Sequence, residues 1–352
     1  MALLFADGFD IYADAADVLK GQWYRENAGN QTFSASNGRY SGGCIQNTVS
    51  TNGWHLGVGS IPNATTIFIA FHYYCVTNTG NGADDAILQG FSQSGNSLFK
   101  IGTNSSGDLR AYAQGVTTTT TVGTSAAAFS NATWHWVEVK IVLGTTNTDG
   151  EITVQVNGTQ LINATGIDTF LNSTATGRLE SFGFYGGTGD CRFDDVIIYD
   201  STGSHMNNFL GETKIETIIP NGDGSTLDWT ASGGTDFSTV DDGIGVADDD
   251  TTYLSSSTAT DVTELQMSNL SNNPTQIHGV QVRTRSRKED AGARTYRTYA
   301  KSGASTENGI TLGLTTAYCW RRNGVHYVDP NTSIAWTGSG VNGMHVGLEL
   351  LS

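Results

Sequence analysis

Positively charged residues are scarce in this sequence. Its 352 residues include 18 Lys and Arg against 34 Asp and Glu, which gives a formal net charge of −16. A protein that binds nucleic acid neutralises phosphates with an excess of cations. The charge balance therefore predicts that nucleic acid is not a partner of this chain.

Long apolar runs and metal-binding cysteine motifs are also lacking. No run of 18 apolar residues occurs, and the first residues lack the charged and apolar regions of a secretory signal, so we expect neither a membrane span nor a signal peptide. The four cysteines, Cys44, Cys75, Cys191 and Cys319, show no CxxC spacing, and most lie in apolar runs. We therefore predict buried free thiols.

Catalytic patterns are absent too. The seven histidines stand singly, and the motifs HxxxH and G-x-S-x-G do not occur. A retaining glycosidase holds two carboxyl groups about 5 Å apart, whereas the adjacent acids Asp194 and Asp195 are expected on opposite faces of a strand. We therefore predict that the chain is not an enzyme. A polysaccharide depolymerase that joins carboxylates from distant strands stays as an alternative.

Short runs rich in β-branched and aromatic residues fill the sequence, and many of its 44 glycines separate them. In residues 133–143, "TWHWVEVKIVL", Val137, Val139 and Ile141 alternate with polar residues, as in a half-buried strand. The next run, "EITVQVNGTQLI", turns at Asn157-Gly158, a strong hairpin signal. These patterns predict an all-β fold with two β-sandwich (jelly-roll-like) domains in tandem.

Composition divides the chain into two domains. Residues 1–200 read as strands at near-regular spacing, residues 201–210 form a polar linker without periodicity, and residues 211–352 form a second β-rich domain. The second domain begins with a stretch, residues 220–250, that is rich in Asp and has no Lys or Arg. Seven of the 18 cations follow in residues 280–303.

The separation of acidic and basic blocks predicts a charged contact surface in the second domain. Alternation in "GVQVRTRSRKE" places one row of cations on one strand face. They can pair with the acidic stretch inside the domain, meet an acidic surface on another subunit, or bind an anionic ligand. The candidate assembly residues are Arg283, Arg285, Arg287, Lys288, Arg294, Asp248, Asp249 and Asp250.

Two further candidate sites lie in the first domain. Trp134 and Trp136 share one strand face, and flat aromatic rings on a β-sandwich can stack on sugar rings, although core packing is the ordinary role of Trp. Asp7 and Asp195 would come close if the first and last strands pair, and could hold a structural Ca²⁺ with backbone oxygens. Turn and strand-end hydrogen bonding is the alternative for both acids. No other cofactor is expected.

Two parts of the chain resemble known families. Residues 3–200 resemble a concanavalin A-like jelly roll of the laminin G or pentraxin type, through "FADGFDIY", "WHWVEVKIV", "GEITVQVNGTQL" and "FDDVIIYD". Residues 208–352 resemble a domain of virion structural proteins of tailed bacteriophages. The matching stretches run in order from "FLGETKIETIIPNGDG" through "VQVRTRSRKEDAGARTYRTYAKSG" to "DPNTSIAWTGSGVNGMHVGLEL".

The resemblance implies a structural component of the virion, in a tail, a fibre or a capsid decoration, made in the bacterial host cytoplasm. It implies other virion proteins as partners, a homo-oligomer with a trimer favoured, and a jelly roll that projects outward and binds host-surface glycan. It implies no catalytic residues. A free lectin-like carbohydrate-binding protein is the alternative.

Overall fold

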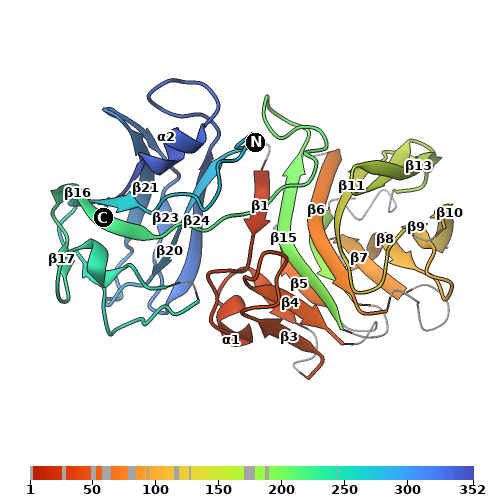
Figure 1. Ribbon diagram of the computed structural model, residues 1–352, viewed down its shortest axis with the longest axis horizontal. Coiled ribbons are helices and arrows are strands. Elements are labelled where there is room, and N and C mark those ends of the chain that lie inside the picture. The colour runs from red at the N-terminus through yellow and green to blue at the C-terminus, as the bar shows by residue number, and fades with distance from the viewer. Residues whose placement is uncertain are drawn as a thin grey trace. The chain divides into compact units, whose positions relative to one another are not determined.

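The computed structural model describes residues 3–25, 29–48, 53–57, 65–77, 85–92, 95–114, 119–126, 128–169, 179–186, 190–243 and 245–352. The chain divides into two compact units, residues 1–215 and 216–352, which we call the N-terminal and C-terminal units (Figure 1). Helix in the described ranges is confined to α1 (Ala15–Val18), α2 (Gly338–Asn342) and one 3-10 turn, η1 (Phe237–Thr239). The prediction of an all-β protein is therefore confirmed.

The structure bears on two further expectations, the position of the linker and the absence of a membrane span. Residues 201–210, which the sequence pattern marks as a linker, lie within the N-terminal unit, and the division falls after residue 215. No helix in the described part of the chain is long and apolar enough to cross a membrane.

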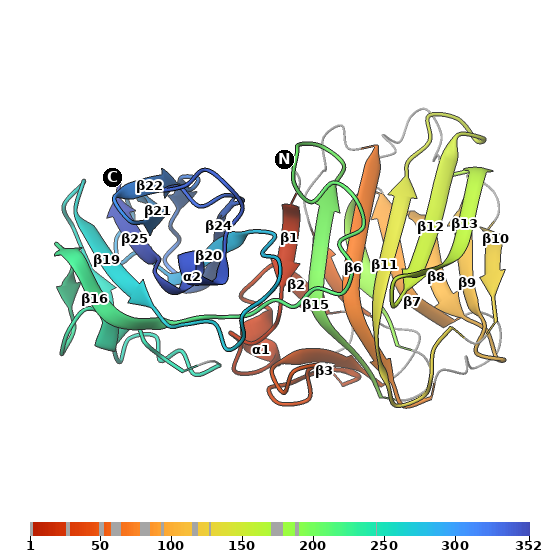
Figure 2. The ribbon, with the colours of Figure 1, turned by 45° about the horizontal axis from the view of Figure 1, so that its top comes forward.

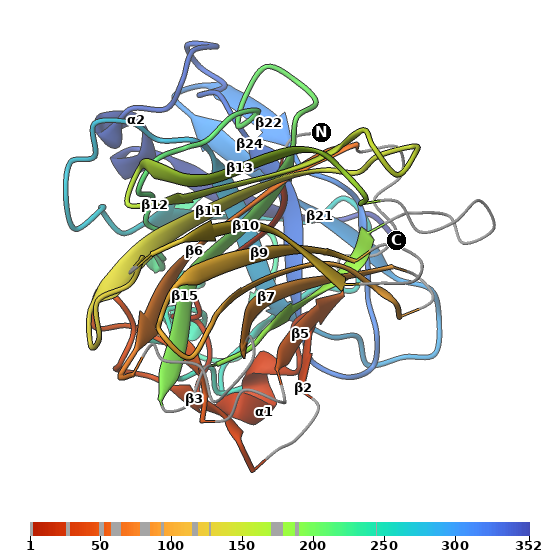
Figure 3. The same ribbon diagram turned by 90° about the vertical axis from the view of Figure 1, so that its right-hand side faces the viewer.

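The N-terminal unit consists of two antiparallel sheets that lie face to face (Figures 2 and 3). In the described residues, eight strands form one sheet: β13 (Thr159–Ile167), β12 (Gly150–Val156), β11 (Trp134–Val142), β6 (Thr66–Cys75), β15 (Cys191–Asp200), β4 (Cys44–Asn47) and β3 (Gln31–Ser34), with β1 (Leu3–Asp7) also paired to β15. Seven form the other: β10 (Thr119–Ser125), β9 (Leu109–Gln114), β8 (Ser97–Thr103), β7 (Asp85–Ser92), β14 (Leu179–Phe184), β5 (Trp54–Gly57) and β2 (Trp23–Arg25).

The core of this unit lies between the two sheets. Phe71 of β6 packs edge-on against Phe184 of β14, with ring centroids 5.6 Å apart, and both side chains are fully buried. Burying one such ring stabilises the fold by about 1.5–3 kcal/mol. Because side chains alternate along a strand, Phe71 on the inner face places Phe68 and His72 on the outer face of the eight-stranded sheet. That outer face carries the candidate site.

The turn between β12 and β13 follows from two residues. Asn157 and Gly158 both have positive φ, 50° and 76°, as a two-residue type I′ hairpin requires. The Asn157 side chain accepts a hydrogen bond from the Trp136 backbone N–H at 2.9 Å. The predicted hairpin is confirmed, and it fixes the register of β12 and β13 beside β11.

Two of the four cysteines form a disulfide, which corrects the prediction of free thiols. Cys75 on β6 and Cys191 on β15 occupy directly paired positions of neighbouring strands, with Cα atoms 4.1 Å apart. The sequence pattern could not bring them together, because 116 residues separate them. Cys44 and Cys319 are free, and Cys44 is buried.

The C-terminal unit is built on one larger sheet. In the described residues that sheet contains β16 (Pro220–Leu227), β19 (Val262–Met267), β25 (His345–Leu350), β21 (Thr295–Ser302), β22 (Ser305–Asn308) and β23 (Leu312–Gly313). Two ribbons accompany it: β17 (Thr230–Ala231) with β18 (Leu254–Ser255), and β20 (Val280–Ser286) with β24 (Cys319–His326).

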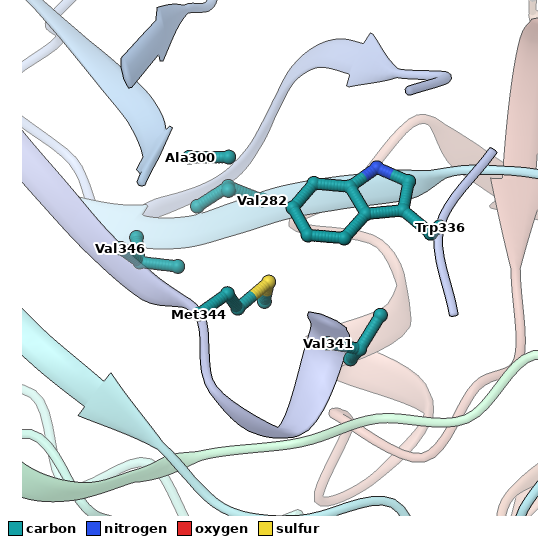
Figure 4. Close-up of a cluster of buried hydrophobic side chains, with 6 residues drawn as sticks. All are labelled: Val282, Ala300, Trp336, Val341, Met344 and Val346. Atoms are coloured by element: carbon teal, nitrogen blue, oxygen red, sulfur yellow. The ribbon is translucent and has the colours of Figure 1, made fainter. Parts of the chain in front are cut away.

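A small apolar core joins the larger sheet to the β20–β24 ribbon. Figure 4 shows its side chains: Val282, Ala300, Trp336, Val341, Met344 and Val346. The indole N–H of Trp336 donates to the carbonyl of His326 at 2.9 Å, so this buried polar atom is satisfied.

Candidate functional site

The outer face of the eight-stranded sheet carries rows of side chains from directly paired positions. One row crosses five strands, from Tyr199 on β15 through Phe68, Lys140 and Thr153 to Asn163 on β13. Paired residues of neighbouring strands point to the same side of a sheet. The row therefore changes from aromatic at β15 to polar at β13.

A groove of about 400 Å³ lies along this row. The sheet forms its floor, and the chain that follows β15, drawn in green in Figure 2, forms one wall. Its lining combines amides, hydroxyls, two aromatic rings and one ion pair: Thr66, Phe68, Lys140, Glu151, Thr153, Gln160, Asn163, Ser201, Asn207, Asn208 and Phe209.

Hydrogen bonds fix the polar floor of the groove. The Lys140 ammonium donates to Glu151 at 2.9 Å, and the Thr153 hydroxyl lies 2.8 Å from the same carboxylate oxygen and 3.2 Å from Asn163 Oδ1. Burial raises the pKa of Glu151, but the bonds from Lys140 and Thr153 outweigh it and leave that pKa below its usual value. Glu151 is therefore a carboxylate near neutral pH, and Lys140 neutralises it.

Aromatic rings form the end of the groove near β15. Phe68 stacks on Tyr199 with centroids 5.0 Å apart, and Phe209 meets Phe68 edge-on at 5.3 Å. Phe68 and Tyr199 are buried, whereas Phe209 is half-buried. Phe209 is therefore the ring of this wall that a ligand can reach.

Buried carboxylates hold the wall segment, residues 207–215, on the sheet. Glu138 of β11 accepts hydrogen bonds from the backbone N–H groups of Leu210 at 2.7 Å and Gly211 at 3.3 Å. Asp195 accepts one from Ile215 at 2.7 Å. Burial raises the pKa of Glu138, and the bonds from Leu210 and Gly211 oppose that rise. Glu138 and Asp195 therefore hold this wall of the groove in place.

A histidine–carboxylate cluster occupies the other end of the same face. His72 Nδ1 lies 3.0 Å from Asp195, its Nε2 lies 3.4 Å from Glu212, and the ring is fully buried. The Tyr40 hydroxyl donates to Glu212 at 3.5 Å. Glu212 and Tyr40 are the exposed members, so the cluster meets solvent through a carboxylate and a phenol.

Asp195 bonds His72 in this cluster, and Asp194 occupies the β15 position paired with His72, although strict alternation predicts opposite faces for the two acids. The Asp194 carboxylate accepts hydrogen bonds from the backbone N–H groups of Arg39 and Asp195, both at 2.7 Å. The ladder between β15 and β6 is irregular between Asp194 and Ile197, and Asp195 has φ 50°. Such a bulge re-aims a side chain. Burial, together with the nearby Asp195 carboxylate, raises the pKa of Asp194 well above its usual value.

The predicted sugar-stacking tryptophans lie beside this cluster. Trp134 is half-buried and lies 5.4 Å from the Tyr74 ring, so one part of it faces solvent. Trp136 is only 1% exposed and packs against His72 at 4.8 Å. The prediction that Trp136 stacks on a sugar needs correction, because its ring faces are covered.

Asp7 and Asp195, the predicted calcium ligands, lie on paired strands but already have protein partners. Asp7 accepts hydrogen bonds from the Phe9 N–H, the Tyr12 hydroxyl and the Trp23 indole at 2.7–3.0 Å. Ca²⁺ takes six to eight oxygen ligands, so a calcium site here would need oxygens beyond those of these two carboxylates. No group of three or more His, Cys, Asp or Glu in the described ranges could hold a metal ion. Calcium binding stays a prediction.

In the C-terminal unit, the cations of β20 pair with the acidic loop, residues 248–250. Arg285 donates to both carboxylate oxygens of Asp249, at 2.5 and 2.9 Å, and lies over the rings of Trp320 and Tyr318. Arg287 donates to Asp250 at 2.8 Å. Of the alternatives for the cation row, pairing inside the domain therefore applies to Arg285 and Arg287.

The other predicted assembly residues have different neighbours. Arg294 pairs with Asp290 at 2.5 Å, and the Lys288 ammonium contacts the carbonyl of Gly292. Arg283 lies opposite Arg322 in the β20–β24 ribbon. Asp248 accepts hydrogen bonds from Thr252 within its turn. A role of these residues in assembly stays a prediction.

Comparisons with known proteins were made by sequence and by structure. No protein-family model matches this chain, and no curated protein sequence matches it. Similar solved structures include the alginate lyase Aly36B (12% identity, TM-score 0.41, 56% of this chain and 97% of that chain). A carbohydrate esterase of a Shiga toxin-encoding bacteriophage (15%, 0.38, 57% and 99%) and an alginate lyase of a Chlorella virus (12%, 0.34, 55% and 92%) are also similar.

These similarities correct one prediction, but they do not assign the activities of those proteins to this chain. The sequence pattern predicts that the chain is not an enzyme, yet the similar structures include alginate lyases and a carbohydrate esterase. The prediction that enzymatic activity is excluded is therefore wrong. All three structures are less than 25% identical to this chain, so their substrates remain properties of those proteins.

Proposed function

We propose that this chain is a structural component of a tailed-bacteriophage virion whose N-terminal unit faces outward and binds host-surface glycan in the groove. The observation that carries glycan binding is the groove itself. Sugars present hydroxyl groups and apolar ring faces, so a site for them needs fixed polar groups beside an accessible aromatic ring. Gln160, Asn163 and Phe209 supply this combination, and the buried Thr153 hydroxyl contacts Glu151 and Asn163 and so fixes the polar floor beneath them.

The virion role draws on the second half of the chain. Residues 208–352 resemble a domain of phage structural proteins, and this unit would dock to other virion proteins or form a homo-oligomer, with a trimer favoured. Mass spectrometry of purified particles tests the first point, because a structural component is present in a fixed copy number. Light scattering at low and high salt tests the second. A free lectin-like protein would be missing from the particle.

Glycan binding is tested with the full chain on a printed glycan library. Thr153→Val and Asn163→Ala each remove one polar group of the floor, and each is expected to weaken binding about tenfold, which corresponds to one hydrogen bond. Trp134→Ala serves as the matched control on the same sheet face but outside the groove. If Trp134→Ala abolishes binding and the groove variants do not, the site lies at the other end of the face.

Glycan cleavage is a second candidate, and the cluster of His72, Asp195, Glu212 and Tyr40 favours it. A carboxylate and a phenol at the surface, backed by a buried imidazole, can transfer protons. Incubation of the full chain with bound glycans should then release reducing ends, and Glu212→Gln should stop the release. Unchanged glycan length after prolonged incubation would exclude this candidate.

A further inference from the structure

We infer that the groove selects uncharged glycan and discriminates against sugars that carry carboxylate or sulfate groups. This inference rests on the proposed glycan binding and adds the chemical class of the ligand. It follows from the charges of the lining, from the surroundings of Lys140, and from the arrangement of the row across the sheet.

Among the described residues, the lining contains one cation and one anion, and they neutralise each other. Lys140 and Glu151 are joined at 2.9 Å, and their side chains are 28% and 23% exposed. The other lining residues that the structure describes are uncharged: Thr66, Phe68, Thr153, Gln160, Asn163, Ser201, Asn207, Asn208 and Phe209. A site for an anionic sugar would be expected to offer an excess of donors and positive charge. This groove offers amides and hydroxyls, which both donate and accept.

Glu151 lies beside any anionic group that would bond Lys140. A ligand carboxylate that reached the ammonium would stand close to the Glu151 carboxylate, which is joined to Lys140 at 2.9 Å, and the two like charges would repel each other. The Thr153 hydroxyl also lies within hydrogen-bond distance of Glu151, so the carboxylate is fixed from two sides. An uncharged sugar meets no such cost, because it can bond the outer polar atoms while the ion pair stays intact.

The electrostatics of the whole chain act in the same direction. The formal net charge of −16 repels a polyanion as it approaches. Salt screens this repulsion over roughly 10 Å at 0.1 M. Binding of an uncharged glycan should therefore be insensitive to salt, whereas any binding of an acidic glycan should change with salt concentration.

The geometry of the row favours a short chain of sugars over a single one. Its five residues occupy five neighbouring strands, and strands lie about 4.8 Å apart, so the row extends over roughly 19 Å. Phe209 at the β15 end can cover the apolar face of one ring. Asn163 at the β13 end can bond hydroxyl or acetamido groups of another.

The test uses a printed library of matched pairs: neutral hexose and N-acetylhexosamine oligosaccharides, and the same oligosaccharides with sialic acid, uronate or sulfate. We expect the full chain to bind neutral members at least about tenfold more tightly than their charged partners. We also expect the Kd of the best neutral binder to be the same at 50 mM and 500 mM salt, within about twofold. Thr153→Val should reduce binding of that glycan about tenfold.

Two results would overturn the inference, and they can be told apart. Tighter binding to the charged members, lost on Thr153→Val, would leave the groove as the glycan site but refute its preference for uncharged ligands. Binding to no member of the library, or binding that Thr153→Val and Asn163→Ala both leave unchanged, would refute the proposed glycan site and this inference with it.

Discussion

Replacement of Arg285 should destabilise the C-terminal unit, because its side chain holds the acidic loop, residues 248–250, on the β20–β24 ribbon. Its side chain is 9% exposed and bonds Asp249 through two hydrogen bonds, and Asp249 is 35% exposed. Breaking a fully buried ion pair costs about 3–5 kcal/mol, and an exposed pair contributes about 0–1 kcal/mol. The rings of Trp320 and Tyr318 add about 0.5–1 kcal/mol. We therefore expect Arg285→Ala to lower the free energy of unfolding of this unit by about 2–3 kcal/mol.

A double-mutant cycle separates the ion pair from other effects of truncation. Arg285→Ala, Asp249→Ala and the double variant are compared by hydrogen exchange of peptides from β20 and β24 in the full chain, which reports on this unit alone. Arg294 and Asp290 provide the control pair, because their side chains are 46% and 48% exposed at a comparable distance of 2.5 Å. We expect a coupling energy of about 1.5–2.5 kcal/mol for the first pair and below about 0.5 kcal/mol for the control. Equal coupling energies for the two pairs would refute the reasoning and would favour a contact surface for another chain.

Three further predictions concern the N-terminal unit. Glu138→Ala removes the acceptor of the Leu210 N–H. We therefore expect faster hydrogen exchange in residues 208–212 and weaker glycan binding. Unchanged exchange would show that Glu138 does not hold the wall of the groove. Alkylation of the denatured, unreduced chain should label two cysteines, Cys44 and Cys319; labelling of all four would contradict the pairing. Loss of the Cys75–Cys191 bond should cost about 2–5 kcal/mol because it closes a long loop. Burial raises the pKa of Asp10 to about 6, so the folded state binds this proton more tightly than the unfolded state, and stability should fall as pH rises from about 4 to 6. Asp10→Asn should remove that dependence, as thermal unfolding at several pH values would reveal.

Local sequence patterns were sufficient to predict the elements of the fold. Alternation along β11 and the Asn157-Gly158 turn both depend on neighbouring residues, and the strands and the turn lie where these patterns place them. The bulge at Asp195 breaks the same rule, because a positive φ at a non-glycine residue leaves no mark in the alternation. Asp195 therefore bonds His72, the residue paired with Asp194, which strict alternation excludes.

The groove depends on which strands lie side by side, and local patterns do not give that order. β15 lies beside β6, and β6 beside β11, although long segments separate them in sequence. Thr153 and Asn163 look like ordinary solvent-facing positions of two strands until β13, β12 and β11 are placed in register. A weak signal was present, because both strands alternate polar with apolar residues around the predicted turn.

The two tryptophans show that alternation along a strand does not predict which side chains are exposed. Trp134 and Trp136 share a face as alternation predicts, but exposure depends on what covers that face. His72 from the neighbouring strand packs on Trp136, and the segment that ends at residue 215 crosses the same sheet. Residues 201–210 have the composition of a linker, yet they belong to the wall of the groove, because buried carboxylates and Phe68 provide partners that composition does not reveal.

The contributions of two carboxyl groups to stability should change in opposite directions as pH falls. The ionised form of Asp10 is destabilised in the N-terminal unit, whereas the ionised form of Glu264 is stabilised in the C-terminal unit. Glu264 in the larger sheet of the C-terminal unit is 3% exposed, and it accepts hydrogen bonds from Lys301 at 2.6 Å and from the Ser225 hydroxyl at 2.6 Å. Burial raises the pKa of Glu264, but these bonds outweigh it and lower the pKa to about 2.

A lowered pKa means that the unfolded state binds the proton more tightly, so the stability from Glu264 is complete above about pH 4.5 and is lost as pH falls toward 2. The stability difference between the wild type and Glu264→Gln, measured by hydrogen exchange in β19 and β21, should therefore shrink between pH 5 and pH 3. Asp10 gives the opposite sign in the N-terminal unit over a window from about pH 6 to 4. A difference for Glu264→Gln that stays constant down to pH 3 would show that Lys301 and Ser225 do not stabilise the charged form of this carboxylate.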